Sequence, residues 1–190
     1  FRRLRNKSLG KQPGWLEELA AQAIRPEIGC VGALLLYPDG TIQHAGVVVG
    51  MHGGADHAYT HLHYPTSVHN GRPQLLTNWG AVTGACLMVR TEVFKKVGGF
   101  DEAFPVEFND IDFCLRCGQL GYRNVVVPEA ILIHRESQSR DVPKSVTASL
   151  ALQRLQCLWS ANLVSTQPWW PASSASNMRD GRPIGLEYLL

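Results

Sequence analysis

Two acidic residues at the start of one predicted helix have the types and spacing that catalysis would need. Asp110 and Asp112 lie in the segment FNDID (108–112), directly ahead of a helical stretch that runs to Leu120. A carboxylate within hydrogen-bond reach of a hydroxyl group can accept its proton as a general base. The structural alternative for Asp110 is a simple helix N-cap, because the helix dipole favours a negative charge there. Asp112 can pair with Arg116, which follows four residues later.

The elements that position these carboxylates follow from the hydrophobic pattern. Apolar runs between turn residues predict four strands, and stretches with helical spacing predict four helices. The predicted strands are Cys30–Tyr37, Thr41–Gly50, Val82–Arg90 and Asn124–Val127, with a further strand edge at Ile131–His134 after a turn at Pro128-Glu129-Ala130. The predicted helices are Trp15–Ala23, Thr91–Val97, Asp110–Leu120 and Ser149–Leu163. Strands interspersed with helices predict an α/β domain with a mixed sheet, in which Val82–Arg90 is buried.

Several short motifs follow one another in a fixed order along the chain. The segment 13–46 contains PGWLEEL and then YPDGTIQHAG. Residues 83–140 contain TGAC-x-x-x-R, VGGFDE, NDxDxCLR, GYR-x-x-x-VPEA and IH-x-ES-x-SR. This order resembles the C-terminal, acceptor-side half of the catalytic domain of family 2 glycosyltransferases, which have the GT-A fold, and bacterial rhamnosyltransferase-like members in particular. The resemblance implies a partial GT-A sheet without the N-terminal nucleotide-binding half.

The resemblance assigns roles to individual residues. It implies that Asp110 is the general base, and that Asn109 stands where the family usually has the first carboxylate of a Glu-Asp pair. It implies that His134 lies near the metal and the donor diphosphate. The residues that it places on the acceptor side are Thr83, Gly84, Ala85, Asn109 and Asp112. We therefore expect Asp110 and the Thr83–Cys86 segment to line one cleft, with His134 at its edge.

The same resemblance implies an inverting transfer from a nucleotide sugar to a hydroxyl of a glycan or a lipid-linked acceptor. It also implies a divalent cation, Mg²⁺ or Mn²⁺, held by an acidic DxD triplet. Counted back from PGWL, that triplet falls near Lys7-Ser8-Leu9, which are not acidic. We therefore expect a fragment that is inactive alone, with an apolar sheet edge and face left uncovered. The alternative is a non-catalytic remnant or a carbohydrate-binding module.

Domain limits follow from the same comparison with the family pattern. We predict a basic segment at 1–12, the glycosyltransferase-like half domain at 13–165, and a loosely held tail at 166–190. The first residue is Phe1 rather than Met, which also favours a fragment or a processed product.

Composition excludes several other classes of protein. A formal charge of +2 is too small to indicate nucleic-acid binding. No apolar run reaches the ~20 residues of a membrane span, although peripheral membrane contact is compatible with the sequence. Five cysteines, an odd number, do not form a disulfide framework, and Cys114 and Cys117 are predicted to be buried thiols. The predicted location is the cytoplasm, including the inner face of the membrane.

A histidine-rich segment between Met51 and Asn78 is the remaining candidate for chemistry. It contains His52, His57, His61, His63 and His69. Their spacing is irregular, and Asp56 is the only carboxylate among them, so we predict a polar surface loop rather than a dedicated metal site. His44, just before this segment, is predicted to be structural and close to the rim of the pocket.

Overall fold

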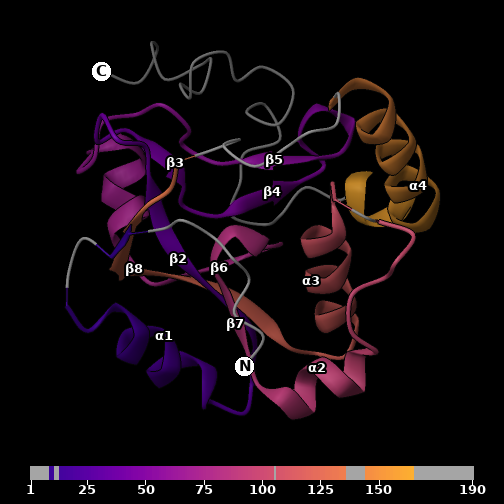
Figure 1. Ribbon diagram of the computed structural model, residues 1–190, viewed down its shortest axis with the longest axis horizontal. Coiled ribbons are helices and arrows are strands. Elements are labelled where there is room, and N and C mark those ends of the chain that lie inside the picture. The colour runs from indigo at the N-terminus through magenta and orange to yellow at the C-terminus, as the bar shows by residue number, and fades with distance from the viewer. Residues whose placement is uncertain (1–8, 11–12, 105, 136–143, 165–190) are drawn as a thin grey trace.

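The computed structural model describes residues 9–10, 13–104, 106–135 and 144–164 (Figure 1). Its helices are α1 (Trp15–Ala23), α2 (Thr91–Val97), α3 (Asn109–Gln119) and α4 (Lys144–Val164). Its strands are β1 (Leu9–Gly10), β2 (Ile28–Leu36), β3 (Ile42–His44), β4 (Val47–Val49), β5 (Ala55–His57), β6 (Thr77–Trp79), β7 (Leu87–Val89) and β8 (Arg123–Ile133). The predicted segments 1–12 and 166–190 lie largely or wholly outside the described residues.

Two long strands form the centre of the main sheet. β2 and β8 run parallel, and each is flanked by shorter antiparallel strands. β7 and β3 pair with β2, whereas β6 and β1 pair with β8. β4 and β5 form a separate antiparallel pair. The prediction of a mixed sheet with flanking helices is confirmed, and the arrangement is that of a GT-A-like domain.

The alternating side chains of β2 pack against two different layers. Cys30, Leu34 and Leu36 belong to the cluster that includes α3, and the intervening Val31 and Leu35 belong to the cluster that includes α1. In Figure 1, α1 and α3 lie accordingly on opposite sides of the sheet. Because all nine β2 residues are buried, the expected uncovered apolar face is not found at the centre of this sheet.

The predicted strand Thr41–Gly50 is in fact two strands that belong to different sheets. β3 pairs with β2, and β4 pairs with β5. The break falls at Gly46, which has a φ of 128° and lies against the Trp79 ring. A Cβ atom at Gly46 would come within 2.0 Å of that ring, so only glycine allows the chain to turn there.

The predicted strand Val82–Arg90 is correct only for its last part. Gly84–Cys86 forms a single 3-10 turn, and β7 begins at Leu87. β7 is half-buried rather than buried, although Val82 itself is fully buried. An apolar run does not reveal such a turn, because the hydrophobic pattern of a short buried strand and of a buried turn is the same.

The predicted strand Asn124–Val127 and the predicted strand edge Ile131–His134 belong to one continuous strand, β8. Its parallel pairing with β2 continues on both sides of Pro128-Glu129-Ala130. Val127 pairs with Ala33 and Ile131 pairs with Leu34, so the three intervening residues form a bulge opposite a single step of β2. Proline is tolerated at such a bulge because no ladder hydrogen bond is required of it.

The arginine of the TGAC-x-x-x-R motif connects this region to α1. Arg90 donates to the carbonyl oxygen of Ala23 over 2.9 Å and to that of Pro26 over 3.1 Å, and it also bonds the carbonyl of Arg25. These carbonyls lie at or just after the C-terminal end of α1, where the helix leaves them without partners of its own. Arg90 therefore joins the end of β7 to the layer on the α1 side.

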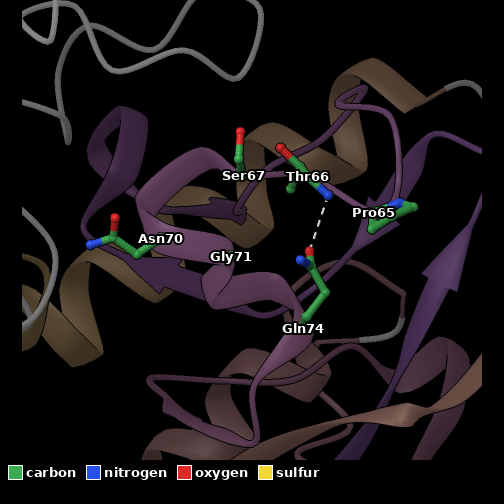
Figure 2. A pocket seen from close by; sticks show the side chains of 6 residues that line it. All are labelled: Pro65, Thr66, Ser67, Asn70, Gly71 and Gln74. Atoms are coloured by element: carbon green, nitrogen blue, oxygen red, sulfur yellow. Dashed lines mark hydrogen bonds between the residues drawn. The ribbon is translucent and has the colours of Figure 1, made fainter.

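The histidine-rich segment is only partly the predicted surface loop, because it contains β5 and two 3-10 helices, Met51–Gly53 and Val68–Gln74. An open pocket of about 530 Å³ lies against its second half. Figure 2 shows the residues that line it, which are Pro65, Thr66, Ser67, Asn70, Gly71 and Gln74. The backbone N–H of Thr66 donates to the Gln74 side chain over 3.1 Å, which closes the loop on itself. His69 and Asn70 both adopt positive φ angles of 50° and 57°, a conformation rarely taken by residues other than glycine.

Candidate active site

The centre of the candidate site is the turn Thr83–Ala85. The backbone N–H of Gly84 donates to the Asp110 carboxylate over 2.6 Å, and the N–H of Ala85 donates to the Thr83 hydroxyl over 3.2 Å. The N–H of Thr83 points at Nε2 of His44 at the longer distance of 3.5 Å. Three consecutive backbone donors are thus held by side chains rather than by a sheet partner, which makes the turn a defined structure.

Cysteine and asparagine side chains hold the residues before this turn. The thiol of Cys114 lies 3.5 Å from the backbone nitrogen of Val82 and 3.7 Å from its carbonyl oxygen. Asn124, which is buried, donates to the carbonyl oxygens of Gly80 and Cys114 over 3.0 Å each. Cys114 and Cys117 are both fully buried free thiols, as predicted. Cys114 of α3 and Asn124 of β8 therefore hold the segment that leads into the turn.

Asp110 lies in the first turn of α3 and is half-buried. Its Oδ2 accepts from Gly84, and its Oδ1 accepts from the backbone N–H of Ile111 over 2.9 Å. The N-cap residue is Phe108 rather than Asp110, and its backbone is left-handed, with a φ of 63°. A left-handed Phe is strained by roughly 1–3 kcal/mol. Its ring packs against the core, which holds this conformation in place.

This geometry leaves lone pairs of Asp110 for a further hydrogen bond. A carboxylate has about four lone-pair sites, and the two backbone bonds occupy two of them. Among the interactions described for Asp110 none is with a cation, so its negative charge is oriented by backbone N–H groups. Asn109, also half-buried, is the neighbouring residue at the start of α3.

Three histidines lie beside the turn. His44 is fully buried, and its Nδ1 is 2.9 Å from Nδ1 of His57, which comes from β5. Burial, and then the nearby His57 and His134, hold the pKa of His44 well below its ordinary value. The backbone N–H of His134 donates to the carbonyl of Leu36 at the end of β2. The sequence analysis placed His44 and His134 near the pocket, whereas it assigned His57 only to the histidine-rich surface loop.

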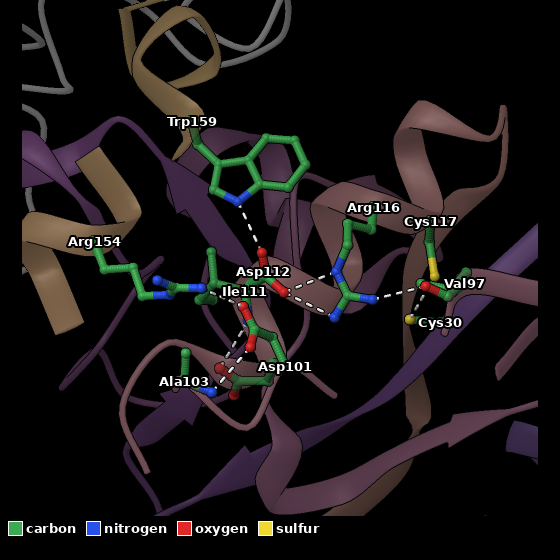
Figure 3. A network of polar contacts seen from close by, with 11 residues as sticks. Cys30, Val97, Asp101, Ala103, Ile111, Asp112, Arg116, Cys117, Arg154 and Trp159 are labelled. Atoms are coloured by element: carbon green, nitrogen blue, oxygen red, sulfur yellow. Dashed lines mark hydrogen bonds and ion pairs between the residues drawn. The ribbon is translucent and has the colours of Figure 1, made fainter. Parts of the chain in front are cut away.

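The environment of Asp112 differs from that of Asp110, although the two residues are only two positions apart. It is 2% exposed, and its Oδ2 accepts from Arg116 Nε over 2.8 Å. Its Oδ1 accepts from the indole N–H of Trp159 on α4 over 2.9 Å. Figure 3 shows this network, in which Arg116 also donates to the carbonyl of Val97. Oδ1 of Asp112 thus joins α3 to α4, and Oδ2 orients Arg116, which joins α3 to the end of α2.

A second pocket, of about 340 Å³, borders this network between α3 and α4. Arg154 of α4 forms an ion pair with Asp101 over 2.9 Å at its margin (Figure 3). The residues that line the pocket are Asp101, Asp112, Arg116, Gln119, Arg154, Leu158 and Trp159. We expected a cleft around Asp110. In the structure Asp110 contacts Gly84 directly, and the lining of the two pockets described above does not include Asp110.

The described residues do not fit a bound divalent cation. No group of three His, Cys, Asp or Glu side chains in that part of the chain comes together as ligands would. The histidines of the loop have separate partners: His52 pairs with Asp56, His61 stacks on Tyr37, and His69 contacts the Tyr59 hydroxyl. The metal expected near His134 is therefore not supported by a group of three ligands among the described residues.

Comparison with known proteins gives one family for most of the chain. The model of glycosyl transferase family group 2 matches residues 15–177. The uncharacterized protein y4gI of Sinorhizobium fredii is 52% identical over 132 residues, which are 67% of this chain and 14% of that protein. The O-antigen biosynthesis protein RfbC of Myxococcus xanthus is 50% identical over 129 residues, 67% of this chain and 10% of that protein.

A third relative is the N-acetylglucosaminyl-diphospho-decaprenol L-rhamnosyltransferase of Mycobacterium tuberculosis. It is 30% identical over 135 residues, 67% of this chain and 44% of that protein. The chain therefore matches less than half the length of each of these relatives. None of the described helices combines the length and apolar character needed to cross a bilayer.

Proposed function

Because the chain belongs to glycosyl transferase family group 2, we propose that it forms the acceptor-side part of an inverting glycosyltransferase. The donor is a nucleotide sugar, and the acceptor is a hydroxyl group of a glycan or a lipid-linked saccharide. Two relatives are named for O-antigen biosynthesis and for L-rhamnosyl transfer, which supports a role in polysaccharide assembly with rhamnose as the first donor sugar to test.

The observation that carries this proposal is the contact between Asp110 and the Gly84 N–H. In our proposal the acceptor hydroxyl binds above the Thr83–Ala85 turn and donates a hydrogen bond to the remaining lone pairs of Asp110. As the hydroxyl oxygen attacks the anomeric carbon, its proton passes to Asp110. The bond from that carbon to the nucleotide diphosphate breaks on the opposite face, so the anomeric configuration inverts.

The parallel pairing of β2 and β8 supports a substrate position beyond the carboxyl ends of these strands. His44 pairs with Leu35 and the N–H of His134 bonds Leu36, so both histidines are at the carboxyl end of β2. β7 is antiparallel to β2, so the turn that precedes it projects toward the same end. Ligands of open α/β sheets bind beyond the carboxyl ends of the parallel strands. We therefore propose that His134 faces the donor diphosphate.

On the acceptor side we propose Thr83, Gly84, Ala85 and Asn109 as contact residues. Asp112 is left out of this set, because Arg116 and Trp159 already bind its two oxygens. We also propose that the intact enzyme takes Mg²⁺ or Mn²⁺ on carboxylates other than those described, since these do not form a ligand set. No step is derived through that cation. The five free thiols support a reducing, cytoplasmic setting.

The test is sugar transfer by the complete product of the gene that encodes this chain. It is incubated with a panel of nucleotide sugars, including nucleotide-activated L-rhamnose, with Mn²⁺ and a lipid-diphosphate-linked saccharide as acceptor. We expect a product lengthened by one sugar, with inverted anomeric configuration by NMR. Absence of transfer and of donor hydrolysis with every sugar would contradict the proposal.

A second candidate function is saccharide binding without catalysis. The observation that favours it is the open pocket of Figure 2, whose lining offers hydroxyl and amide groups from Thr66, Ser67, Asn70 and Gln74. Such groups can donate to and accept from sugar hydroxyls. Oligosaccharide titration followed by NMR would show shifts in these residues. Binding there that persists in an Asp110→Asn variant, with no transfer by the unmodified protein, would favour this candidate.

A further inference from the structure

The buried contact between two histidine rings admits only one arrangement of protons. Nδ1 of His44 and Nδ1 of His57 are 2.9 Å apart, so one of these nitrogens must carry a proton and the other must not. The opposite ring nitrogen of His44, Nε2, faces the backbone N–H of Thr83, which is itself a donor. A proton on Nε2 would place two donors against each other, so Nε2 must be the acceptor.

The proton positions of both rings follow from this constraint. In neutral His44 the proton is on Nδ1, which donates to Nδ1 of His57. His57 then carries its own proton on Nε2. A further proton on Nδ1 of His57 would break the contact between the rings, and one on Nε2 of His44 would break the contact to Thr83. Burial of His44 at 0% exposure keeps water from supplying a substitute partner.

We propose that His44 and His57 are positioning residues for Asp110. Their tautomeric arrangement fixes the orientation of the Thr83–Ala85 turn, and this turn holds the Asp110 carboxylate in place. The N–H of the peptide unit between Thr83 and Gly84 is bound by Asp110. The N–H of the preceding peptide unit, which belongs to Thr83, faces His44. The effect on catalysis rests on the proposed function, whereas the tautomers and the orientation of the turn can be measured without a substrate.

His57 reaches this position because of the strand pairing around it. β5 pairs with β4, with His57 opposite Val47, and the N–H of Val47 donates to the carbonyl of Ala81, just ahead of the turn. The β4–β5 pair is thus attached both to the turn and to the ring that orients His44. A change at His57 should therefore be felt at Gly84, although His57 has no described contact with Asp110.

The first measurement is an imidazole ¹H–¹⁵N correlation spectrum of the unmodified, ¹⁵N-labelled chain at pH 7.5. We expect a protonated Nδ1 and an unprotonated Nε2 for His44, and the reverse for His57. A His44 ring with its proton on Nε2 would overturn the proposal outright. This arm requires no variant, so it does not depend on any altered protein folding.

The second measurement is amide hydrogen exchange at Thr83 and Gly84 in variants of the loop. His57→Leu removes the acceptor for His44, and we expect exchange at both amides to rise about fivefold, as for loss of one neutral hydrogen bond. His57→Asn keeps an acceptor near the position of Nδ1 and should stay within about twofold of the unmodified chain. Tyr59→Phe is the matched control, because it deletes a hydroxyl in the same loop that bonds His69 instead.

The third measurement separates positioning from general stability. In the complete gene product we expect His57→Leu to lower kcat about tenfold with an unchanged KM for the donor, because only the alignment of Asp110 is affected. His57→Asn should restore most of this loss. Unchanged exchange in His57→Leu, or an equal rise in Tyr59→Phe, would overturn the positioning role. The expected tautomers and exchange without any sugar transfer would instead contradict the proposed function.

Discussion

Asp110 and Asp112 leave the same helix two residues apart and enter opposite environments. Asp110 is half-buried and is held by the backbone N–H groups of Gly84 and Ile111. Asp112 is 2% exposed and is bound by the Arg116 guanidinium and the Trp159 indole. Successive helical residues are rotated by about 100°, so side chains two apart point to nearly opposite sides.

The difference shows how two identical carboxylates acquire separate roles. A carboxylate bound by a cation inside the protein is best suited to joining elements, because its lone pairs are committed to fixed partners. A carboxylate oriented by backbone N–H groups keeps lone pairs for a ligand, and its orientation is set in advance. The region around Asp112 therefore holds α4 on α3, and the region around Asp110 is the one for which we propose proton transfer.

The largest effect should come from breaking the buried side of this comparison. Asp112→Ala leaves Arg116 without its carboxylate partner and the Trp159 N–H without an acceptor. We expect the free energy of unfolding to fall by about 3–5 kcal/mol, as for removal of one member of a buried ion pair. Urea denaturation followed by circular dichroism measures it. A loss below about 1 kcal/mol would mean that the network contributes little to stability.

The next effect concerns activity rather than stability. Asp110→Asn keeps an oxygen that can accept from Gly84 but cannot take up a proton. In the complete gene product we expect the turnover rate to fall by ~10²-fold or more, with donor binding nearly unchanged. Glu102→Gln, the loss of an exposed carboxylate, is the matched control and should leave turnover unchanged. Normal turnover by Asp110→Asn would make Asp110 a structural residue only.

A smaller effect should appear as a pH dependence of stability. Burial of His44, with His57 and His134 nearby, lowers its pKa in the folded state, so below about pH 6.5 the unfolded chain binds a proton that the folded chain does not. Stability should therefore fall as the pH drops, by up to about 1.4 kcal/mol per pH unit. Urea midpoints between pH 7.5 and 5 measure this slope. His44→Gln should flatten it, and an unchanged slope would assign it to other groups.

The smallest effect is expected at the exposed margin of the buried network. Arg154 and Asp101 form an ion pair whose side chains are 43% and 32% exposed, so solvent screens the attraction. Arg154→Gln should lower the free energy of unfolding by about 0.2–1 kcal/mol, and less at high salt. The same urea experiment with and without 0.5 M NaCl, which shortens the Debye length to about 4 Å, tests it. A loss comparable to that of Asp112→Ala would contradict the distinction between the two ion pairs.

Local pattern was sufficient for the elements whose signals lie in neighbouring residues. The bounds of α1 and α2 agree with the predicted ranges, and α3 begins and ends one residue earlier than predicted. The predicted C-terminal helix is longer in the structure, where α4 begins at Lys144. Strand limits were predicted less well, because β-structure depends on partners far away in the chain. Gly46 illustrates this, since Trp79, 33 positions later, decides where the strand breaks.

The sequence by itself determined the family and the mixed α/β fold, and it suggested the short set of residues that we propose for the chemistry. It did so because motif order and hydrophobic period are carried by residues close together in the chain. Only the tertiary structure decided that Asp110 meets Gly84 while Asp112 meets Arg116 and Trp159. It also decided that His57 completes a buried contact with His44. Such choices depend on which side chains meet in space, and the order of residues along one element does not contain that information.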